Sequence, residues 1–320
     1  MDNATTRTER FFEPFAELGA AALGVLCFSL TVPATRSAVP EFGVWLVGAG
    51  RSVVAGALAL CVLVVRREPW PARADLTALA LVALGVVFGF PICSAIALGS
   101  VPAVHALVVI GLVPMATALI AVARNDERPS LEFWLASSCG ALAVFAFGFT
   151  QASLHVAAAD AWLVAAVLSA AFGYGEGARL TRRLGGWRVI SWALVLSLPL
   201  SSALTVLALP RHPLTFAAAV SWRAWLGFAY VALVSMYLAY FAWYRGLVRT
   251  TIARASQVQL AQPILGLFWS WLLLGEHVTL AMLLTAGFVL VCAACASRAR
   301  IRLAAPPPTS ATDGARPTIS

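Results

Sequence analysis

A long stretch without charge places the strongest constraint on the fold of this chain. Residues 76–123 contain no Asp, Glu, Lys or Arg. One helical crossing of a bilayer uses roughly 20 apolar residues, so this stretch is too long for a single crossing. The sequence G-S-V-P at 99–102 offers a break, because glycine and proline interrupt helices. We therefore expect two successive helices, at 76–98 and 102–123.

The composition of the chain is that of an integral membrane protein. Hydrophobic residues make up 61% of the 320 residues and charged residues 11%, whereas a soluble domain carries about 25% charge. A water-soluble fold could not cover so much apolar surface. Every basic residue is an arginine, and the arginines lie in separate short loops rather than in one patch. No nucleic-acid partner is therefore expected, despite the net charge of +8.

Apolar runs between short charged loops predict an all-α integral membrane protein with ten transmembrane helices. The first run lacks a short apolar core followed by a cleavage site, so it is expected to remain as the first helix, with Pro40 in the turn after it. The expected helices cover residues 17–35, 43–65, 76–98, 102–123, 132–151, 160–179, 188–209, 224–245, 252–274 and 278–297.

The two halves of the chain repeat one pattern. The spacing from Pro114 to Glu127 equals the spacing from Pro263 to Glu276, and a fixed internal period is a sign of repeated structural units. Five helices per half is an odd number, so the second half is expected to insert upside down relative to the first. Such inverted repeats are the arrangement from which alternating-access transporters are built.

The expected organisation of the chain has four parts. Residues 1–15 form a cytoplasmic N-terminal segment, residues 16–151 the first five-helix repeat and residues 152–297 the second repeat. Residues 298–320 form a disordered cytoplasmic tail, because their proline-rich sequence is too poor in apolar residues to fold alone.

The distribution of arginine sets the expected orientation. With the N-terminus inside the cell, all but four of the 22 basic residues fall in cytoplasmic segments. The exceptions are Arg36, Arg51, Arg211 and Arg223. Because cytoplasmic loops of membrane proteins are enriched in Lys and Arg, both termini are expected in the cytoplasm.

The doubled pattern and its ending resemble the drug/metabolite transporter superfamily, in particular its bacterial ten-helix EamA type. Each half has a short step (Ala97-Leu98 and Gly246-Leu247), a tight hairpin and a helix with a central proline. The second half ends in L-L-L-G-E at 272–276, whereas the first half departs from this ending with N-D-E at 125–127. The resemblance covers about residues 16–297.

The resemblance implies a secondary transporter of small metabolites, amino acids or drugs, often an exporter, in the inner (plasma) membrane of a bacterial cell. It implies a substrate cavity between the two halves and contact with the lipid bilayer, and it names no substrate. Arg51 is similar to the basic residue that such proteins often carry early in the second helix. Protons as coupling ion and a homodimer both remain open.

Polar side chains inside apolar runs are the candidate cavity residues, because they are costly in hydrocarbon. The helix expected at 252–274 begins with a polar face that includes Ser256, Gln259 and Gln262, and this face is the strongest cavity prediction. Tyr237 and Tyr240 share one face of the preceding helix. Their aromatic stripe either lines the cavity or packs between helices.

Two basic side chains are further candidates for the cavity. Arg51 lies about eight residues into the second helix, where a charge is a functional-site hypothesis by default. The alternative is that its long stem reaches up to the outer headgroups. His105 lies early in the fourth helix and is either a packed polar residue or a donor to an anionic group of the substrate.

Three carboxylates and two prolines complete the set. Glu176 is the only carboxylate expected inside a helix, with Arg179 three residues on. It is either an interfacial ion pair or a group that couples transport to protons, because burial disfavours its charge. Glu127 and Glu276 are expected to have a structural role in helix-joining loops, where each precedes or nearly precedes a helix start that favours carboxylates. Pro114 and Pro263 are expected to loosen their helices.

Enzyme and metal motifs are absent from the sequence. It contains no G-x-S-x-G, no H-E-x-x-H and no Gly-rich phosphate loop, and its six cysteines fall inside apolar runs. No cofactor and no metal site is expected. A lipid-modifying membrane enzyme and a polytopic protein without transport activity are the alternatives, and the inverted repeat favours transport over both.

The arginine distribution predicts the topology directly. A reporter fused after Arg298 should score as cytoplasmic, and one inserted near His155 should score as external, because the expected helices place these positions on opposite sides. Reporter activity in intact cells measures both. The reverse pattern would contradict ten helices with a cytoplasmic N-terminus.

Overall fold

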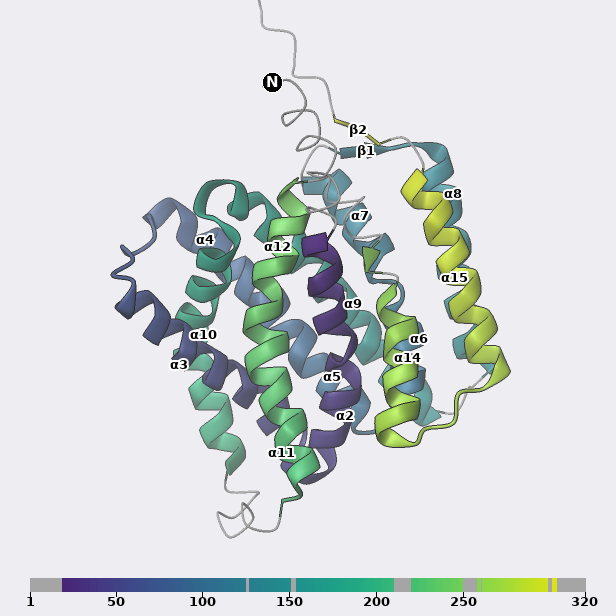
Figure 1. Cartoon of the computed structure of the whole chain (residues 1–320), viewed down its shortest axis with the longest axis horizontal. Helices are drawn as coiled ribbons and strands as arrows, with labels where there is room; N and C mark the ends of the chain where they lie inside the picture. Colours follow the sequence, from purple (N-terminus) through teal and green to yellow (C-terminus); the bar gives the residue numbers. More distant parts are fainter. Residues whose placement is uncertain are drawn as a thin grey trace, which may run out of the picture.

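The computed structural model of the chain describes residues 19–124, 127–150, 154–209, 220–249, 258–259, 261–298 and 301–303. These residues form a bundle of helices (Figure 1). The predicted all-α class is confirmed, apart from two three-residue strands, β1 (Glu127–Pro129) and β2 (Ile301–Leu303), which pair antiparallel. Glu127 therefore lies in the connection that precedes the helix beginning at Leu131, and its structural role stays a prediction.

The helical elements of the first half include two π-helical segments, η1 and η2. Residues 19–29 are helical and lead into α2. The elements are α2 (Thr31–Phe42), η1 (Leu46–Gly50), α3 (Arg51–Val65), α4 (Arg73–Val82), η2 (Ala83–Gly89), α5 (Phe90–Leu98), α6 (Ala103–Ile110), α7 (Val113–Arg124) and α8 (Leu131–Thr150).

The described residues of the second half form a similar series of helices, with η5 as a π-helical segment. In Figure 1 the last helix of this half, α15, lies beside α8 of the first half. The elements are α9 (Leu154–Leu184), α10 (Gly186–Ala208), α11 (Trp222–Ala229), η5 (Tyr230–Leu238), α12 (Ala239–Arg249), α14 (Ala261–Leu274) and α15 (Leu280–Arg298).

Within the described part of the chain, six helical stretches are long and apolar enough to cross a membrane, so the chain is a multi-pass membrane protein. They are Gly19–Phe42, Leu46–Val65, Arg73–Leu98, Ala158–Leu184, Gly186–Ala208 and Trp222–Val248. Shorter apolar helices lie at Ala103–Thr117, Leu131–Ala143, Ala261–Leu274 and Leu280–Val289. Helices thus occupy the expected regions, while ten crossings stay a prediction.

The helix boundaries show which local signals were strong. The break at 99–102 is confirmed, since α5 ends at Leu98 and α6 begins at Ala103. The first helix does not end near residue 35 and Pro40 is not in a turn, because the helix runs through Pro40. It stops only at Gly43, whose φ of 78° is a backbone conformation that glycine adopts readily.

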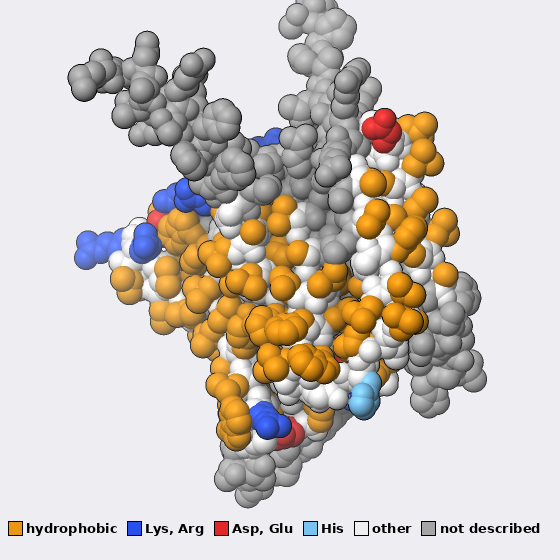
Figure 2. Space-filling model, turned by 45° about the vertical axis from the view of Figure 1, so that its right-hand side comes forward, with side chains coloured by type: hydrophobic (Ala, Val, Ile, Leu, Met, Phe, Trp, Pro, Cys, Tyr) orange, Lys and Arg blue, Asp and Glu red, His pale blue; other side chains and the backbone are white. Residues whose placement is uncertain are grey.

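The outer surface fits a lipid environment. Large apolar side chains are exposed along the helices, among them Val65, Leu131 and Leu207. Figure 2 shows hydrophobic side chains across the middle of the visible face, with the visible charged side chains near its upper and lower ends. An apolar surface between two polar ends is what a bilayer requires of a protein that spans it.

Close backbone contact joins the two halves where η2 crosses α9. A Cβ atom placed on Gly85 would lie 2.6 Å from the carbonyl oxygen of Ser169 and 2.8 Å from Cα of Gly173. Glycine at both positions lets the two segments approach more closely than any side chain would allow. Small residues have this role in membrane helix packing, because lipid provides no hydrophobic drive between helices.

We therefore expect Gly85→Ala to lower the free energy of unfolding by about 1–3 kcal/mol, because the new methyl group must push η2 away from α9. The measurement is the unfolding midpoint of the detergent-purified protein, which should fall. Gly287→Ala is the matched control. A Cβ atom there meets nothing within 4 Å, and alanine favours the helix by about 1 kcal/mol. Equal midpoints for the two variants would show that the contact at Gly85 is not tight.

Candidate functional site

A small, largely buried cavity lies between the two halves. Its volume is about 20 Å³, which is enough for roughly one water molecule. The first half contributes the walls from α2, α3, η2 and α5, and the second half those from α9, η5, α12 and α14. The lining residues are Phe28, Thr31, Arg51, Val86, Phe90, Tyr174, Ser235, Met236, Tyr240 and Gln262.

Arg51 is the one charged side chain among the described lining residues. It is the first residue of α3, and only 1% of it is exposed, so it does not reach the headgroups. Its Nε and Nη2 atoms are buried and have no hydrogen-bond acceptor among the described residues. A buried charge is strongly unfavourable unless it is paired. The guanidinium is therefore the most demanding group in the cavity.

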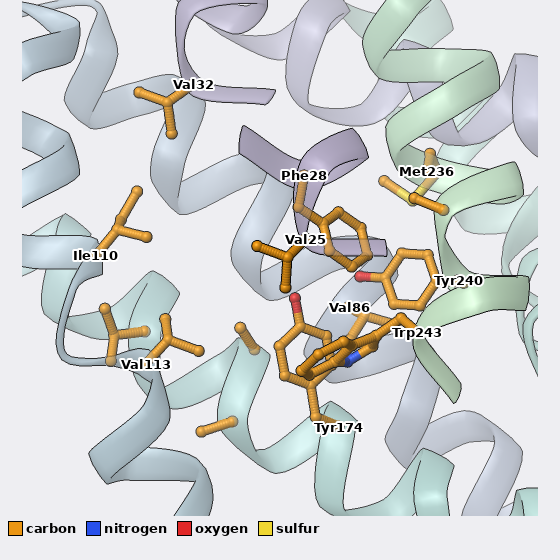
Figure 3. Close-up of a cluster of buried hydrophobic side chains, with 14 of the residues drawn as sticks. Val25, Phe28, Val32, Val86, Ile110, Val113, Tyr174, Met236, Tyr240 and Trp243 are labelled. Atoms are coloured by element: carbon orange, nitrogen blue, oxygen red, sulfur yellow. The ribbon is translucent and has the colours of Figure 1, made fainter. Parts of the chain in front are cut away.

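Aromatic rings form one wall of the cavity. The ring of Tyr240 meets Phe28 edge-on at a centroid distance of 5.1 Å, and Tyr174 lies 6.2 Å from Tyr240. Trp243 packs against Tyr174 at 5.4 Å. Figure 3 shows the hydroxyl groups of Tyr174 and Tyr240 directed toward one space beside Phe28 and Val25. Tyrosine in this position presents both an apolar ring and a polar tip.

Hydroxyl and amide groups complete the lining and connect the halves. The hydroxyl oxygens of Thr31 and Ser235 lie 2.7 Å apart, which joins α2 to η5. Gln262 Nε2 donates a long hydrogen bond of 3.4 Å to the carbonyl oxygen of Phe28. The wall therefore offers neutral donors and acceptors around one cation.

The remaining residues predicted to line the cavity differ in where the structure places them. Gln259 is buried but is not among the described residues that line the cavity, and Ser256 lies outside the described residues. Tyr237 points elsewhere, since its hydroxyl is hydrogen-bonded to that of Ser191 on α10 at 2.9 Å. Of the predicted cavity residues, Arg51, Tyr240 and Gln262 are the ones that the structure brings together.

His105 lies outside the cavity and bridges the two halves. Its Nε2 donates to Oδ1 of Asp160 on α9, at 2.7 Å. Asp160 is the seventh residue of α9 and lies well inside this helix, so the expectation that Glu176 alone is an intrahelical carboxylate is wrong. The error has a local cause: the helix was expected to start at Asp160, whereas it begins at Leu154.

Glu276 has a structural role at a helix start, but at a different helix from the one expected. Its Oε1 and Oε2 accept hydrogen bonds from the backbone amides of Ala103 (3.0 Å) and Val104 (2.9 Å). It therefore caps α6 of the first half rather than α15, the next helix in the chain. The first amides of a helix have no partner within it, so a carboxylate is favoured there.

Glu176 is buried and ion-paired. Its Oε2 lies 3.1 Å from Nη2 of Arg179, whose side chain is 57% exposed while that of Glu176 is 1% exposed. Nearby, Asp75 at the start of α4 pairs with Arg183 of α9 at 3.0 Å. Each of these two exposed arginines of α9 thus forms an ion pair with a different buried carboxylate.

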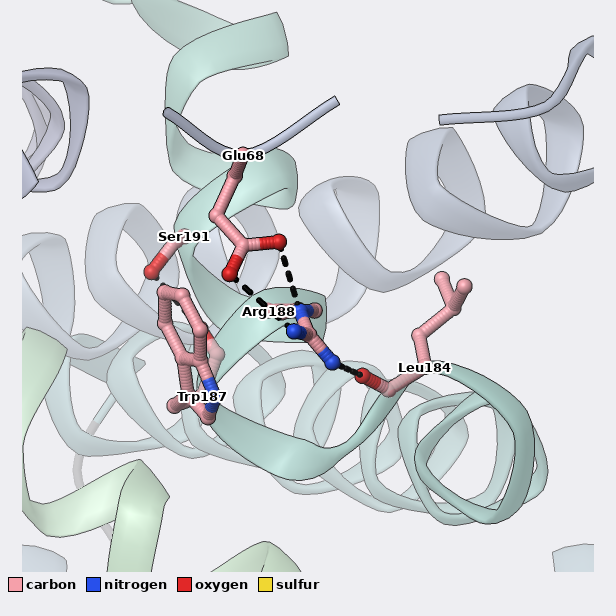
Figure 4. A network of polar contacts seen from close by, with 5 residues as sticks. All are labelled: Glu68, Leu184, Trp187, Arg188 and Ser191. Atoms are coloured by element: carbon pink, nitrogen blue, oxygen red, sulfur yellow. Dashed lines mark hydrogen bonds and ion pairs between the residues drawn. The ribbon is translucent and has the colours of Figure 1, made fainter. Parts of the chain in front are cut away.

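A further polar network joins the halves at this same end (Figure 4). Nε and Nη2 of Arg188 donate to the two carboxylate oxygens of Glu68, at 2.8 and 3.0 Å. Nη1 donates to the carbonyl oxygen of Leu184 at 3.4 Å. The guanidinium carbon also lies 5.2 Å from the centre of the Trp187 ring. Paired parallel hydrogen bonds of this kind are strong and directional.

The two repeat prolines lie in different surroundings. Pro263 is buried in α14, and its Cγ would lie 3.6 Å from a Cβ atom placed on Gly111, at the break between α6 and α7. Pro114 lines a separate small cavity between α7, α8 and α15. The break at 111–112 precedes Pro114, consistent with loosening of that helix.

Sequence reasoning missed Tyr174 and the pair of Thr31 and Ser235. Tyr174 had a signal, because it lies two residues before Glu176 in the sequence F-G-Y-G-E. Thr31 and Ser235 had none, since isolated hydroxyls in apolar helices commonly bond to their own backbone. Among the described residues, no group of three or more His, Cys, Asp or Glu is placed to hold a metal ion.

Two helical halves that enclose a buried polar cavity define the class of membrane transporters. The chain belongs to the EamA-like transporter family, whose model matches it twice, at residues 16–149 and 157–298. The resemblance noted in the sequence is thereby confirmed, and the family is one of transporters rather than enzymes.

Two individual proteins illustrate the relationship. The chain is 43% identical over 276 residues to the uncharacterized transporter YdeK of Bacillus subtilis (strain 168), covering 86% of this chain and 95% of that protein. A solved structure titled only "Crystal structure of protein" has the same fold, with a TM-score of 0.66 and 16% identity. The match covers 88% of this chain and 98% of that chain.

The cap on α6 leads to a stability prediction. Glu276→Gln should lower the free energy of unfolding by about 1–2 kcal/mol, because the amide has one acceptor oxygen for two backbone donors and no charge. The unfolding midpoint in detergent should fall accordingly. Glu132→Gln removes an exposed carboxylate from α8 and serves as the control. If both variants unfold like the parent protein, the cap does not stabilise α6.

Proposed function

We propose that the protein is a secondary transporter that moves a small molecule by alternating access between its two halves. One observation carries this proposal: the cavity around Arg51 is walled by both halves, and its described lining residues are buried apart from the half-buried Phe90. A carrier needs such a site, which opens to one side at a time. A lipid-modifying enzyme would instead need reactive groups, and the cavity presents tyrosine, glutamine and hydroxyl side chains around a single cation.

Polar contacts between the halves are the proposed gates. Toward the proposed external end, His105 of α6 holds Asp160 of α9, and Glu276 holds the start of α6. Toward the proposed cytoplasmic end, Glu68 after α3 holds Arg188 of α10. Because these contacts are hydrogen bonds and ion pairs, each can be exchanged for contacts with water when that end opens. Breaking one set while keeping the other gives access from one side.

The wider arrangement extends the sequence prediction. We propose ten crossings as two inverted five-helix repeats, in which the four shorter apolar helices complete the bundle. Both termini are then cytoplasmic, in the inner membrane of a bacterial cell, and net export is the proposed direction. The positive-inside bias supports the orientation. A homodimer stays a prediction.

Transport can be tested through Arg51. Solutes selected in a resistance screen of overexpressing cells would be followed in sealed vesicles, and Arg51→Ala should reduce their flux at least about tenfold, as expected when a buried charge that binds the solute is lost. Membrane levels of the variant should match the parent protein. Arg223→Ala, at an exposed arginine beside Trp222, is the control and should retain flux.

Full flux in Arg51→Ala would remove Arg51 from the transport path. Chemical turnover of a lipid by the detergent-purified protein, with no solute flux in sealed vesicles, would favour the enzyme alternative over transport.

Coupling to protons is the second part of the proposal. Glu176 could carry the proton if its pair with Arg179 opens in one state, because a dry environment disfavours the charged carboxylate. Glu176→Gln should then abolish the acceleration of transport by a proton gradient while solute exchange persists. Asp160→Asn tests the second intrahelical carboxylate in parallel. Full proton-driven accumulation in Glu176→Gln would leave Glu176 as a structural ion pair.

A further inference from the structure

We propose that the ligand of the central cavity is an organic monoanion: a carboxylate on an apolar or aromatic body that carries no basic group. The structure assigns the carboxylate to Arg51. This inference rests on the proposed transport function for its biological meaning, and it narrows the substrate class, since it excludes cationic drugs and zwitterionic amino acids.

Arg51 has no carboxylate partner among the described residues. None of the described residues that line the cavity is acidic. The carboxylates described within or next to the helices are held elsewhere: Asp160 by His105, Glu176 by Arg179, and Asp75 by Arg183. Glu276 binds the amides of α6, Glu68 binds Arg188, Glu41 of α2 binds Ser221, and Glu132 of α8 is exposed. Among the residues whose side chains are described, no carboxylate is left to pair with the buried charge of Arg51.

The unused donors of Arg51 have a geometry that suits a carboxylate. Nε and Nη2 lie on one edge of a guanidinium and donate in parallel, which matches the two oxygens of a carboxylate. Arg188 shows this in the same protein, where these two nitrogens donate to both oxygens of Glu68. In Arg51 the same two nitrogens are buried without a described acceptor. The cavity thus contains one half of a bidentate pair.

The other walls of the cavity suit an apolar or aromatic ligand body. Phe28, Phe90 and Met236 supply apolar surface beside the hydroxyl groups of Tyr174 and Tyr240. An amine on the ligand would share this small space with the guanidinium and would meet no described carboxylate. Like charges in a low-dielectric cavity repel strongly. The cavity volume of about 20 Å³ is smaller than such a ligand, so the cavity must widen to admit it.

The unpaired charge of Arg51 should also affect the stability of the protein without ligand. An unpaired buried charge destabilises the empty protein, so replacing Arg51 with a neutral side chain should stabilise it. A merely structural arginine would have the opposite effect. The sign of this change separates a ligand-binding role from a structural one.

The experiment measures thermal unfolding of the detergent-purified full chain with matched compounds. The monocarboxylates are butyrate, phenylpropionate and indole propionate. Phenylethylamine, phenylalanine and phenylpropanol supply a cation, a zwitterion and a neutral molecule of similar shape. We expect at least one aromatic carboxylate to raise the midpoint, and the amine and amino acid to leave it unchanged.

Variants locate the effect. Arg51→Gln should unfold at a higher temperature than the parent protein without added compound, and should bind the active carboxylate about 30-fold or more weakly, as for loss of one partner from a buried charge pair. Arg51→Lys, which keeps the positive charge but lacks the two parallel N–H donors of the guanidinium, should retain part of the affinity. Arg223→Gln should behave as the parent protein. If Arg51→Gln fails to fold, Arg51 stabilises the protein, and the proposal is contradicted as it is by a lowered midpoint.

Four outcomes would overturn the proposal. They are stabilisation by the amine or amino acid equal to that by the carboxylates, no stabilisation by any carboxylate, undiminished carboxylate binding in Arg51→Gln, and a lowered midpoint of that variant without compound. Flux in proteoliposomes separates this from the transport proposal. Binding without flux contradicts transport alone, whereas flux of a cation or zwitterion that does not depend on Arg51 contradicts the anion alone.

Discussion

The buried guanidinium of Arg51 is the group on which the centre of this protein depends. A positive charge between membrane helices is unfavourable unless an anion or strong dipoles surround it. Here the first residue of α3 carries this charge into a wall of tyrosine, glutamine and hydroxyl groups that comes from both halves. An enclosed polar site of this kind is costly for a structure that only needs to be stable, and it is useful to one that binds a ligand.

Polar contacts are concentrated at the ends of the bundle, and the reason is the solvent. Lipid gives helices no hydrophobic drive to associate, so close packing and hydrogen bonds must hold them. Close packing is seen where Gly85 meets Gly173. Hydrogen bonds are seen at His105 with Asp160 and at Glu68 with Arg188. Contacts at the ends of the bundle can be replaced by contacts with water when they open.

Features that depend on neighbouring residues in the sequence were predicted correctly, and features that depend on distant helices were not. The turn at 99–102 was predictable because glycine and proline act on their own backbone. The end of the first helix was not, since neighbouring helices allow Pro40 to remain helical, as is common in membrane helices. The capping role of Glu276 was half predictable: a carboxylate at a helix start is a local expectation, but its partner α6 lies far away in the sequence.

The sequence alone determined the membrane class, the all-α fold and the family, because hydrophobicity, charge spacing and the L-L-L-G-E ending are properties of the linear amino-acid sequence. Only the tertiary structure decided which polar groups meet. Arg51, Tyr174, Tyr240 and Gln262 come from four separate helical segments, and Tyr237, one turn from Tyr240, faces Ser191 instead. The rotation of each helix about its axis depends on all its neighbours, so a pattern within one helix cannot fix it.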